Sequence, residues 1–394
     1  MTLIRSAQRE HHWDALRAVL MLLGIPYHVA MTYRAGQVWI LNAGEEGSTF
    51  FTYTAQIIHV FRMPAFFFIA GYFAALLLAR RSPGQWLRGR FTRLGIPLIV
   101  SLLTLNPLLN IACELTNFPA AEALASWIRN SETSGGYWVR HLWFIIVLLY
   151  DCLIAATAVW LFPKLRDALL PTQLDSALAR HVFLTIIAVA LFAGVWEAVS
   201  IELFYLGGFA TNVPQEILRL DQFLEFTPYF LFGCLLSRAP KLQRKLYRFS
   251  PAIAVIAFIA LALDLTLMGL LSPPAGRFLD AIAGVTIAQL FIALMKWVAD
   301  RPSPLIRELV DASFVIYLFH LPIMALLVLA GRSMAMPLAL KASLITLLVL
   351  GLSFGAWRFI RTVPLLRLAF DGISKSASLS TTLPGKRDLR SQGL

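Results

Sequence analysis

The sequence predicts an all-α polytopic membrane protein with about ten transmembrane helices. Of its 394 residues, 58% are hydrophobic and only 14% are charged, and the mean hydropathy is +0.71. A soluble domain is typically about 45–50% apolar and about 25% charged. The apolar residues gather in long stretches, and Lys and Arg concentrate in alternate connections between those stretches. This pattern excludes a soluble globular enzyme, a disordered protein and a disulfide-stapled secreted domain.

The long apolar stretches give the predicted spans, since a membrane-crossing helix needs about 20 mostly apolar residues. The second stretch is long enough to hold a break near Pro64, and the sixth is the weakest because Asp221, Glu225 and Pro228 interrupt it. The predicted spans are residues 14–33, 50–79, 92–113, 139–162, 181–205, 221–237, 251–271, 277–299, 305–330 and 337–360.

The first span follows two cations, as a signal peptide would, but it differs from one in two ways. It contains Arg17 and His28, and no small-x-small cleavage site follows it. A signal peptide needs an uninterrupted apolar region and such a site. We therefore expect the first span to be a retained membrane anchor.

The basic residues indicate the orientation. Of 34 Lys and Arg residues, 25 fall in segments on one side of the predicted membrane, against seven on the other side. Lys and Arg accumulate in cytoplasmic loops, so we expect both termini in the cytoplasm and residues 114–138 to form the longest outer loop. Residues 1–373 are predicted to form a single membrane domain, and residues 374–394 a disordered cytoplasmic tail.

The net charge of +12 therefore reflects topology, and the expected partner is the lipid bilayer, not a nucleic acid. No internal repeat is evident, which argues against a transporter built from two inverted halves. No metal site or disulfide framework is predicted, because no CxxC or CxxxH spacing occurs among the three cysteines, Cys113, Cys152 and Cys234.

Ionisable side chains within the predicted spans are the candidate functional residues. Such a group costs at least a few kcal/mol when it faces lipid, so it usually faces the protein interior or a wet cavity. The first span carries Asp14, Arg17 and His28, and the second carries His59 and Arg62 on one helix face. Asp14 and Arg17 also suit an interfacial i,i+3 pair. A buried Arg62 needs a carboxylate, carbonyl groups or a ligand.

Three further spans carry such residues. Arg90 and Arg93 lie at the start of the third, His141 at the start of the fourth, and Asp311 and His320 in the ninth. Alone, the two arginines are better explained by the excess of cations on the cytoplasmic side. A single histidine within the membrane commonly makes an interhelical hydrogen bond.

Prolines accompany the polar residues of three spans. Pro26, Pro64 and Pro322 each lie within two residues of a buried polar side chain. Proline bends a helix and frees a backbone carbonyl. Kinks and polar groups that coincide three times favour a shared cavity over three independent packing solutions.

The spacing of Arg17 and His28 suggests how such a cavity would work. Eleven residues span about 16 Å along a helix and about three turns, so both side chains can face one cavity. Cations at the cytoplasmic mouth and an imidazole deeper in suit a long anionic donor that enters from the cytosol. An imidazole, with an unperturbed pKa near 6.5, can deprotonate a hydroxyl at the far end.

Five blocks of the chain, in order between about residues 9 and 370, resemble the family-three membrane acyltransferases. These are ten-helix inner-membrane enzymes that move acyl groups from cytoplasmic coenzyme A thioesters to extracytoplasmic glycans. The resemblance is strongest to the members that succinylate osmoregulated periplasmic glucans. The blocks are REHHWDALRAVLMLLGIPYHVAMTY, IIHVFRMPAFFFIAGYF, RFTRLGIPL, RHLWFIIVLL and SFVIYLFHLPI.

The resemblance implies a role for each matching residue. His28 matches the essential histidine, which acts as the general base, and Arg17 matches the basic residue of the same motif. Arg90 and Arg93 match the paired arginines that hold the phosphates of coenzyme A, to which the guanidinium fork is suited. Arg62 would neutralise either the free succinyl carboxylate or the thioester oxyanion.

Five residues complete the candidate set. Asp14 and His320 are the other catalytic candidates, and His59, His141 and Trp143 are candidates for the acceptor side. No Ser-His-Asp arrangement suggests a covalent acyl-enzyme, so direct transfer is favoured. No bound cofactor is expected, and succinyl-CoA is the expected donor substrate.

The expected function is therefore O-acyl transfer in the bacterial inner membrane, from succinyl-CoA to hydroxyls of periplasmic glucans. Glucan synthesis machinery is the protein partner that this function suggests. The nearest alternative is O-acetyl transfer to another envelope polysaccharide. An alternative from another class is a transporter or channel for an anionic solute, in which the buried arginines and histidines line the pathway.

Overall fold

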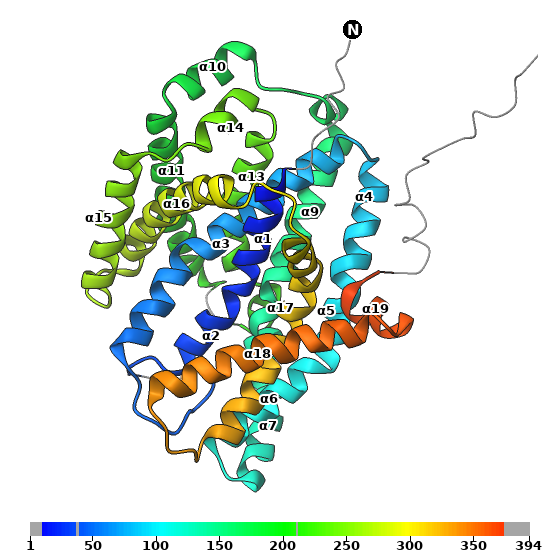
Figure 1. Ribbon diagram of the computed structural model, residues 1–394, viewed down its shortest axis with the longest axis vertical. Coiled ribbons are helices and arrows are strands. Elements are labelled where there is room, and N and C mark those ends of the chain that lie inside the picture. The colour runs from blue at the N-terminus through cyan, green and yellow to red at the C-terminus, as the bar shows by residue number, and fades with distance from the viewer. Residues whose placement is uncertain (1–9, 37–38, 210–211, 374–394) are drawn as a thin grey trace, which may run out of the picture.

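The computed structural model describes residues 10–36, 39–209 and 212–373. The two cations before the first predicted span and the predicted tail, residues 374–394, lie outside the described residues. The regular elements of the described residues are all helices, joined by short connections (Figure 1). One isolated β-bridge in the described residues pairs Arg34 with Ser48. The predicted all-α class is thus confirmed for the described residues.

The first two predicted spans form α1 (His11–Leu22), α2 (Gly24–Thr32) and the long α3 (Thr49–Leu78). The first span breaks between α1 and α2 because Pro26 has no N–H to donate to the carbonyl of Leu22. Helix α3 continues through Pro64.

The next two spans are interrupted as well. The third consists of α4 (Pro83–Arg90), a π-helical turn (Phe91–Gly95), α5 (Ile96–Leu103) and α6 (Leu105–Asn117). The predicted outer loop folds into α7 (Ala120–Thr133) and α8 (Gly135–Val139), and α9 (Trp143–Leu161) follows a 3₁₀ turn.

Short helices alternate with long ones in the second half of the chain. Figure 1 shows α10 and α14 together at one end of the bundle, far from α7 at the opposite end. The helices are α10 (Thr172–Arg180), α11 (Val182–Phe204), α12 (Val213–Leu218), α13 (Leu220–Leu236), α14 (Pro240–Leu246), α15 (Pro251–Leu267), α16 (Pro273–Val298), α17 (Pro304–Gly331), α18 (Leu338–Ile360) and α19 (Pro364–Asp371).

The structure does not confirm the predicted number of spans. Within the described chain, seven helices are long and apolar enough to cross a membrane, or up to nine if each of two bent pairs is one span. The bent pairs are α4–α5 with α6, at 40°, and α14 with α15, at 69°. The sixth predicted span, residues 221–237, corresponds to α13, which has only 17 residues. The prediction of ten spans is therefore not confirmed.

Many large apolar side chains point outward, as expected of a protein surrounded by lipid. Trp297 of α16 is 83% exposed and Phe258 of α15 is 73% exposed. Exposed apolar surface on this scale is unfavourable in water but not in a bilayer. The structure thus supports a multi-pass membrane protein.

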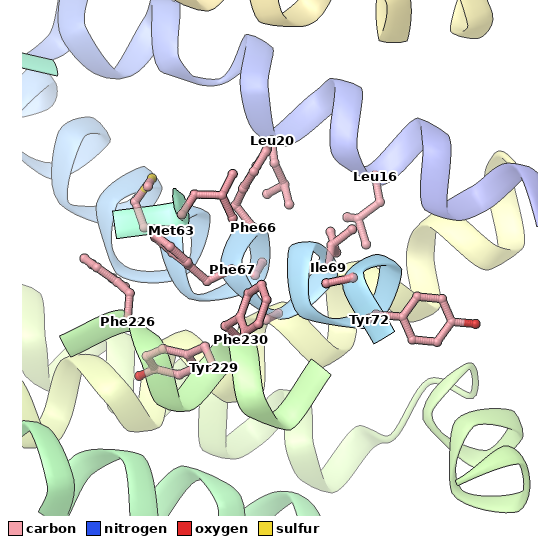
Figure 2. Packing of buried hydrophobic residues seen from close by; sticks show 14 of the residues in the cluster. Leu16, Leu20, Met63, Phe66, Phe67, Ile69, Tyr72, Phe226, Tyr229 and Phe230 are labelled. Atoms are coloured by element: carbon pink, nitrogen blue, oxygen red, sulfur yellow. The ribbon is translucent and has the colours of Figure 1, made fainter. Parts of the chain in front are cut away.

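Helix α3 lies at the centre of the fold, between α1 and α13. Figure 2 shows Leu16 and Leu20 of α1 on one side of α3 and Phe226 and Phe230 of α13 on the other. Phe67 of α3 stacks on Phe226, with ring centroids 5.1 Å apart. This packing holds α1, α3 and α13 together around the cavity described below.

Two glycines allow the close approach of α3 and α13. A Cβ atom on Gly71 would lie 1.8 Å from the carbonyl oxygen of Phe230, and one on Gly233 would lie 1.8 Å from that of Phe68. Small residues at contacts between membrane helices commonly permit such packing. The position of α13, which supplies one wall of the cavity, therefore depends on these glycines.

Candidate functional site

A cavity of about 440 Å³ lies between α1–α2, α3, the start of α9, α13 and α17. The predicted residues His28, Arg62 and His320 all line it. So do His59, His141 and Trp143, the three candidates for the acceptor side. The cavity expected from the coincidence of prolines and polar groups is thus present. The role of each residue stays a prediction.

Three histidines form a row along the cavity wall. The ring centroid of His320 lies 5.1 Å from that of His28 and 5.2 Å from that of His141. The Nδ1 atom of His320 is 2.6 Å from the carbonyl oxygen of Tyr317, which identifies Nδ1 as the protonated nitrogen. The buried Nε2 of His320 and Nδ1 of His28 have no hydrogen-bond partner, so both remain available to a ligand.

Aromatic rings hold His28 in place. Trp39 stacks on its imidazole, with ring centroids 5.1 Å apart and planes only 10° from parallel. Tyr27 contacts the imidazole edge-on at 4.8 Å and also stacks on His59 at 5.9 Å. Because packing restricts its rotamers, His28 is preorganised, as a general base requires.

Arg62 is a cation without a protein counter-charge. Its guanidinium lies 4.6 Å from the ring centroid of Tyr27, and its buried Nε has no hydrogen-bond partner. Within the described chain, no carboxylate forms an ion pair with it. A buried charge is costly unless it is paired. Of the options that the sequence left open for Arg62, the arrangement favours an anionic ligand.

Gly24 keeps the space beside Arg62 open, and we expect Gly24→Ala to impair turnover without unfolding the protein. A Cβ atom there would lie 2.8 Å from Nη1 of Arg62 and 3.8 Å from Nε2 of His320. Displacing a reacting group by about 1 Å can cost about 100-fold in rate, so we expect kcat to fall by at least about tenfold. The matched control is Gly351→Ala, because nothing lies within 4 Å of that added Cβ. Equal kcat values for both variants would contradict the prediction.

Arg140 is a second cation on the cavity wall that the sequence did not single out. Its backbone has φ 47°, ψ −130°, a conformation that is strained for a residue other than glycine. Its Nε donates a 2.7 Å hydrogen bond to Oδ1 of Asn110, and its guanidinium lies 4.4 Å from the ring centroid of Tyr137. The strained turn thus holds a second guanidinium at the cavity.

The remaining polar groups of the cavity come from α13. Gln222 and Glu225 line it one turn apart, near the ring of Phe226. Trp143 of α9 stacks on Phe226, with ring centroids 5.4 Å apart. Carboxylate, amide and aromatic groups together suit the hydroxyls and apolar faces of a sugar.

Four predicted residues lie outside this cavity, namely Asp14, Arg17, Arg90 and Arg93. Arg17 is one helical turn from Leu20, which lines the cavity. Around Arg17, within electrostatic range, are Asp14, Arg90, Arg93 and Asp311. The structure therefore separates the candidates into a cavity group and a basic cluster, defined here as Arg17, Arg90 and Arg93.

A π-helical turn shapes the basic cluster. The amide of Ile96 donates to the carbonyl of Phe91, five residues back, and Arg93 lies within the turn. Such turns occur frequently at functional sites. Arg93 pairs with Asp371 of α19 at 3.3 Å, whereas the guanidinium of Arg90 lies 5.5 Å from the ring of Trp86.

No metal-binding group of three or more His, Cys, Asp or Glu occurs within residues 10–36, 39–209 and 212–373. The cavity histidines are accompanied by tyrosine, tryptophan and arginine. This donor set suits hydrogen bonding and proton transfer.

These observations describe a multi-pass membrane protein with a cavity of histidine and arginine and a basic cluster near its end. The acyltransferase domain that defines the acyltransferase-3 family matches residues 10–358. The chain therefore belongs to this family of membrane acyltransferases, and the family resemblance is confirmed.

The relatives found include glucans biosynthesis protein C from several Escherichia coli strains. The protein of strain 536 (O6:K15:H31) is 29% identical over 330 residues, which cover 80% of this chain and 82% of the relative. The protein of strain K12 is 28% identical over 327 residues, with the same coverage. No solved structure matches the chain.

Three polar aromatic residues of the cavity were missed by reasoning from the sequence, as were Arg140, Gln222 and Glu225. Tyr27 adjoins His28, Tyr317 lies one turn before His320, and Trp39 comes from the connection after α2. The first two belong to the matching blocks, and their spacing from His28 and His320 could have identified them as cavity residues. Trp39 lies outside the predicted spans and had none.

Proposed function

We propose that this protein transfers a succinyl group from cytoplasmic succinyl-CoA to hydroxyls of osmoregulated periplasmic glucans. The observation that carries the proposal is the cavity in which unpaired Arg62 faces the imidazoles of His28 and His320. The names of the relatives support a role in glucan biosynthesis. In this proposal the protein lies in the inner membrane with both termini in the cytoplasm.

The donor would enter past the basic cluster. Arg17, Arg90 and Arg93 would hold its phosphates, since guanidinium groups bind phosphate through parallel hydrogen bonds. The acyl arm would then follow α1 past Leu20 into the cavity. Eleven residues, or about 16 Å of helix, separate Arg17 from His28. A long donor arm is therefore needed.

The acyl group would pass directly from coenzyme A to the glucan, without an acyl-enzyme. His28 removes the proton of a glucan hydroxyl, whose oxygen attacks the thioester carbonyl carbon. Arg62 stabilises the resulting oxyanion. The carbon–sulfur bond then breaks, and the coenzyme A thiolate takes the proton from the His28 imidazolium. Direct transfer is supported because the described residues that line the cavity include no Ser, Thr or Cys.

The guanidinium of Arg140, the second in the cavity, would favour a succinyl donor over an acetyl donor. A succinyl thioester carries one free carboxylate. During transfer its thioester carbonyl oxygen becomes an oxyanion, so two negative charges need partners. Arg62 lies beside the imidazoles, where the carbonyl reacts, and Arg140 lies at the start of α9, toward the predicted outer end. We assign the oxyanion to Arg62 and the free carboxylate to Arg140.

Loss of a donor contact should weaken donor binding selectively. We expect Arg90→Gln to raise KM for the acyl-CoA by about tenfold or more, since a charge-assisted hydrogen bond contributes about 1.5–3 kcal/mol. kcat should change little, because Arg90 lies outside the cavity. Kinetics in membrane vesicles would measure both constants. The control is Arg81→Gln at an exposed position, and a KM increase in both variants would refute a specific contact.

Mass spectrometry of periplasmic glucans from cells with and without the gene tests the proposed function. We expect loss of the gene to remove succinyl mass increments and to leave the glucans neutral, because each succinyl half-ester adds one negative charge. Loss of acetyl groups from another surface polysaccharide, with unchanged glucans, would overturn the proposed donor and acceptor.

A further inference from the structure

A second cavity, of about 500 Å³, lies on the other side of α3, between α11, α13 and α16. We call it the apolar crevice. Its wall is formed almost wholly by hydrocarbon side chains, among them Phe68, Ile186, Phe232 and Ile292. The acyl-transfer chemistry proposed above does not use it. Such a wall suits an apolar ligand and excludes a glycan or a nucleotide.

The apolar crevice opens toward the surrounding lipid. Three residues that line it are about half exposed, namely Leu174 at 48%, Phe192 at 52% and Leu235 at 55%. Along α11 it extends from Thr185 to Phe192, which corresponds to about 10 Å of helix. The hydrocarbon core of a bilayer is about 30 Å thick, so the crevice is deep enough for much of one acyl chain within a single leaflet.

Helices α10 and α14, which lie at the top of the bundle in Figure 1, cover one end of the crevice, since both contribute lining residues. Leu242 and Leu246 of α14 line it. Both carboxylate oxygens of Asp175 in α10 accept 2.9 Å hydrogen bonds from the backbone amides of Lys241 and Leu242. Helix α14 is bent by 69° relative to α15, so it runs across the end of the bundle.

The outer side of this cover is strongly basic. Residues 238–248 contain five Lys and Arg residues and no Asp or Glu. Arg244, Lys245 and Arg248 are exposed. A cluster of cations at the end of a membrane helix attracts anionic lipid headgroups. The amphipathic α14 therefore presents cations immediately above an apolar space.

We propose that the apolar crevice binds one acyl chain of an anionic phospholipid, with the headgroup held by Arg244, Lys245 and Arg248. The crevice shares α3 with the catalytic cavity, because Pro64 and Phe68 line the crevice while Met63 and Phe66 line the cavity. A bound lipid thus fills the space behind α3 and stabilises the helices that carry the site. This inference does not depend on which acyl group is transferred.

Native mass spectrometry of the purified, delipidated protein tests the proposal with phosphatidylglycerol as the probe and phosphatidylcholine, which has no net charge, as the comparison lipid. We expect phosphatidylglycerol to bind more tightly. Replacing Arg244, Lys245 and Arg248 together with Gln should weaken its binding by about tenfold or more. The charge-matched control replaces Arg80, Arg81 and Arg88, which are also exposed, and should leave binding unchanged.

A second pair of variants tests the acyl chain. Val189→Trp fills the crevice, whereas Leu184→Trp places the same ring on the same helix at a position that is 61% exposed and outside it. Bound phosphatidylglycerol should also raise the thermal stability of the unsubstituted protein. We expect only Val189→Trp to abolish both the binding and this stabilisation. Equal binding of the two lipids, or equal binding by the two tryptophan variants, would overturn the proposal.

Discussion

His28→Ala is expected to lower kcat for acyl transfer by about 100-fold to 10,000-fold, the usual contribution of a positioned general acid or base. The imidazole lies between Trp39 and His320, at ring-centroid distances of 5.1 Å from each, on the wall of the cavity that Arg62 and Arg140 also line. Neither neighbour is positioned to replace it. Trp39 is no base, and the free Nε2 of His320 belongs to a ring centred 5.1 Å away, too far to accept the same proton unless the acceptor hydroxyl shifts. The measurement is succinyl incorporation into glucan by membrane vesicles with equal amounts of enzyme.

The control for this variant is His181→Ala, which removes an exposed histidine at the start of α11, outside the cavity. It should transfer acyl groups at the normal rate. Donor binding should survive in His28→Ala, because the basic cluster is intact, so KM for the acyl-CoA should stay nearly constant. A folded and inserted His28→Ala protein with normal kcat would remove His28 from the role of base.

The sequence predicted the helical membrane architecture well, because hydropathy reports directly on what a bilayer requires of a chain. It predicted the bent spans less well. The sixth predicted span became the 17-residue α13, since Asp221 and Glu225 lie on a short helix that begins after the positive-φ residue Arg219. The π-helical turn at Phe91–Gly95 was not predicted, because nothing in local apolar spacing distinguishes it from an α-helix.

The site was predicted in part. His28, Arg62 and His320 were identified because charged or imidazole groups are costly in a membrane and each lies near a proline. Spacing along one helix also placed Arg17 in the same cavity, but the structure locates it one turn beyond the wall. Arg140 was counted only as an outer-loop cation. Its role as a cavity residue depends on a strained backbone and on Asn110, 30 residues earlier, which a linear pattern does not reveal.

Single substitutions of the two cavity arginines are expected to distinguish the residue that stabilises the oxyanion from the residue that selects the acyl donor. Arg62→Gln should lower kcat by about 100-fold to 1,000-fold with any acyl donor, as is typical when one oxyanion partner is lost. Arg140→Gln should mainly reduce kcat/KM for succinyl-CoA and leave that for acetyl-CoA nearly unchanged, because acetyl has no free carboxylate. The measurement is a competition between the two donors in the same vesicles, with products distinguished by mass.

The two results have different physical origins, which makes the comparison decisive. An interaction present only in the transition state changes kcat, whereas one made with a remote part of the substrate discriminates between substrates. Loss of a charge-assisted pair costs about 1.5–3 kcal/mol, or roughly 10-fold to 150-fold in the ratio of the two donors. If Arg62→Gln instead removes the preference for succinyl-CoA while Arg140→Gln slows both donors equally, the two assignments must be exchanged. If neither variant changes the donor ratio, the free carboxylate is not recognised in this cavity, and acetyl transfer becomes the better proposal.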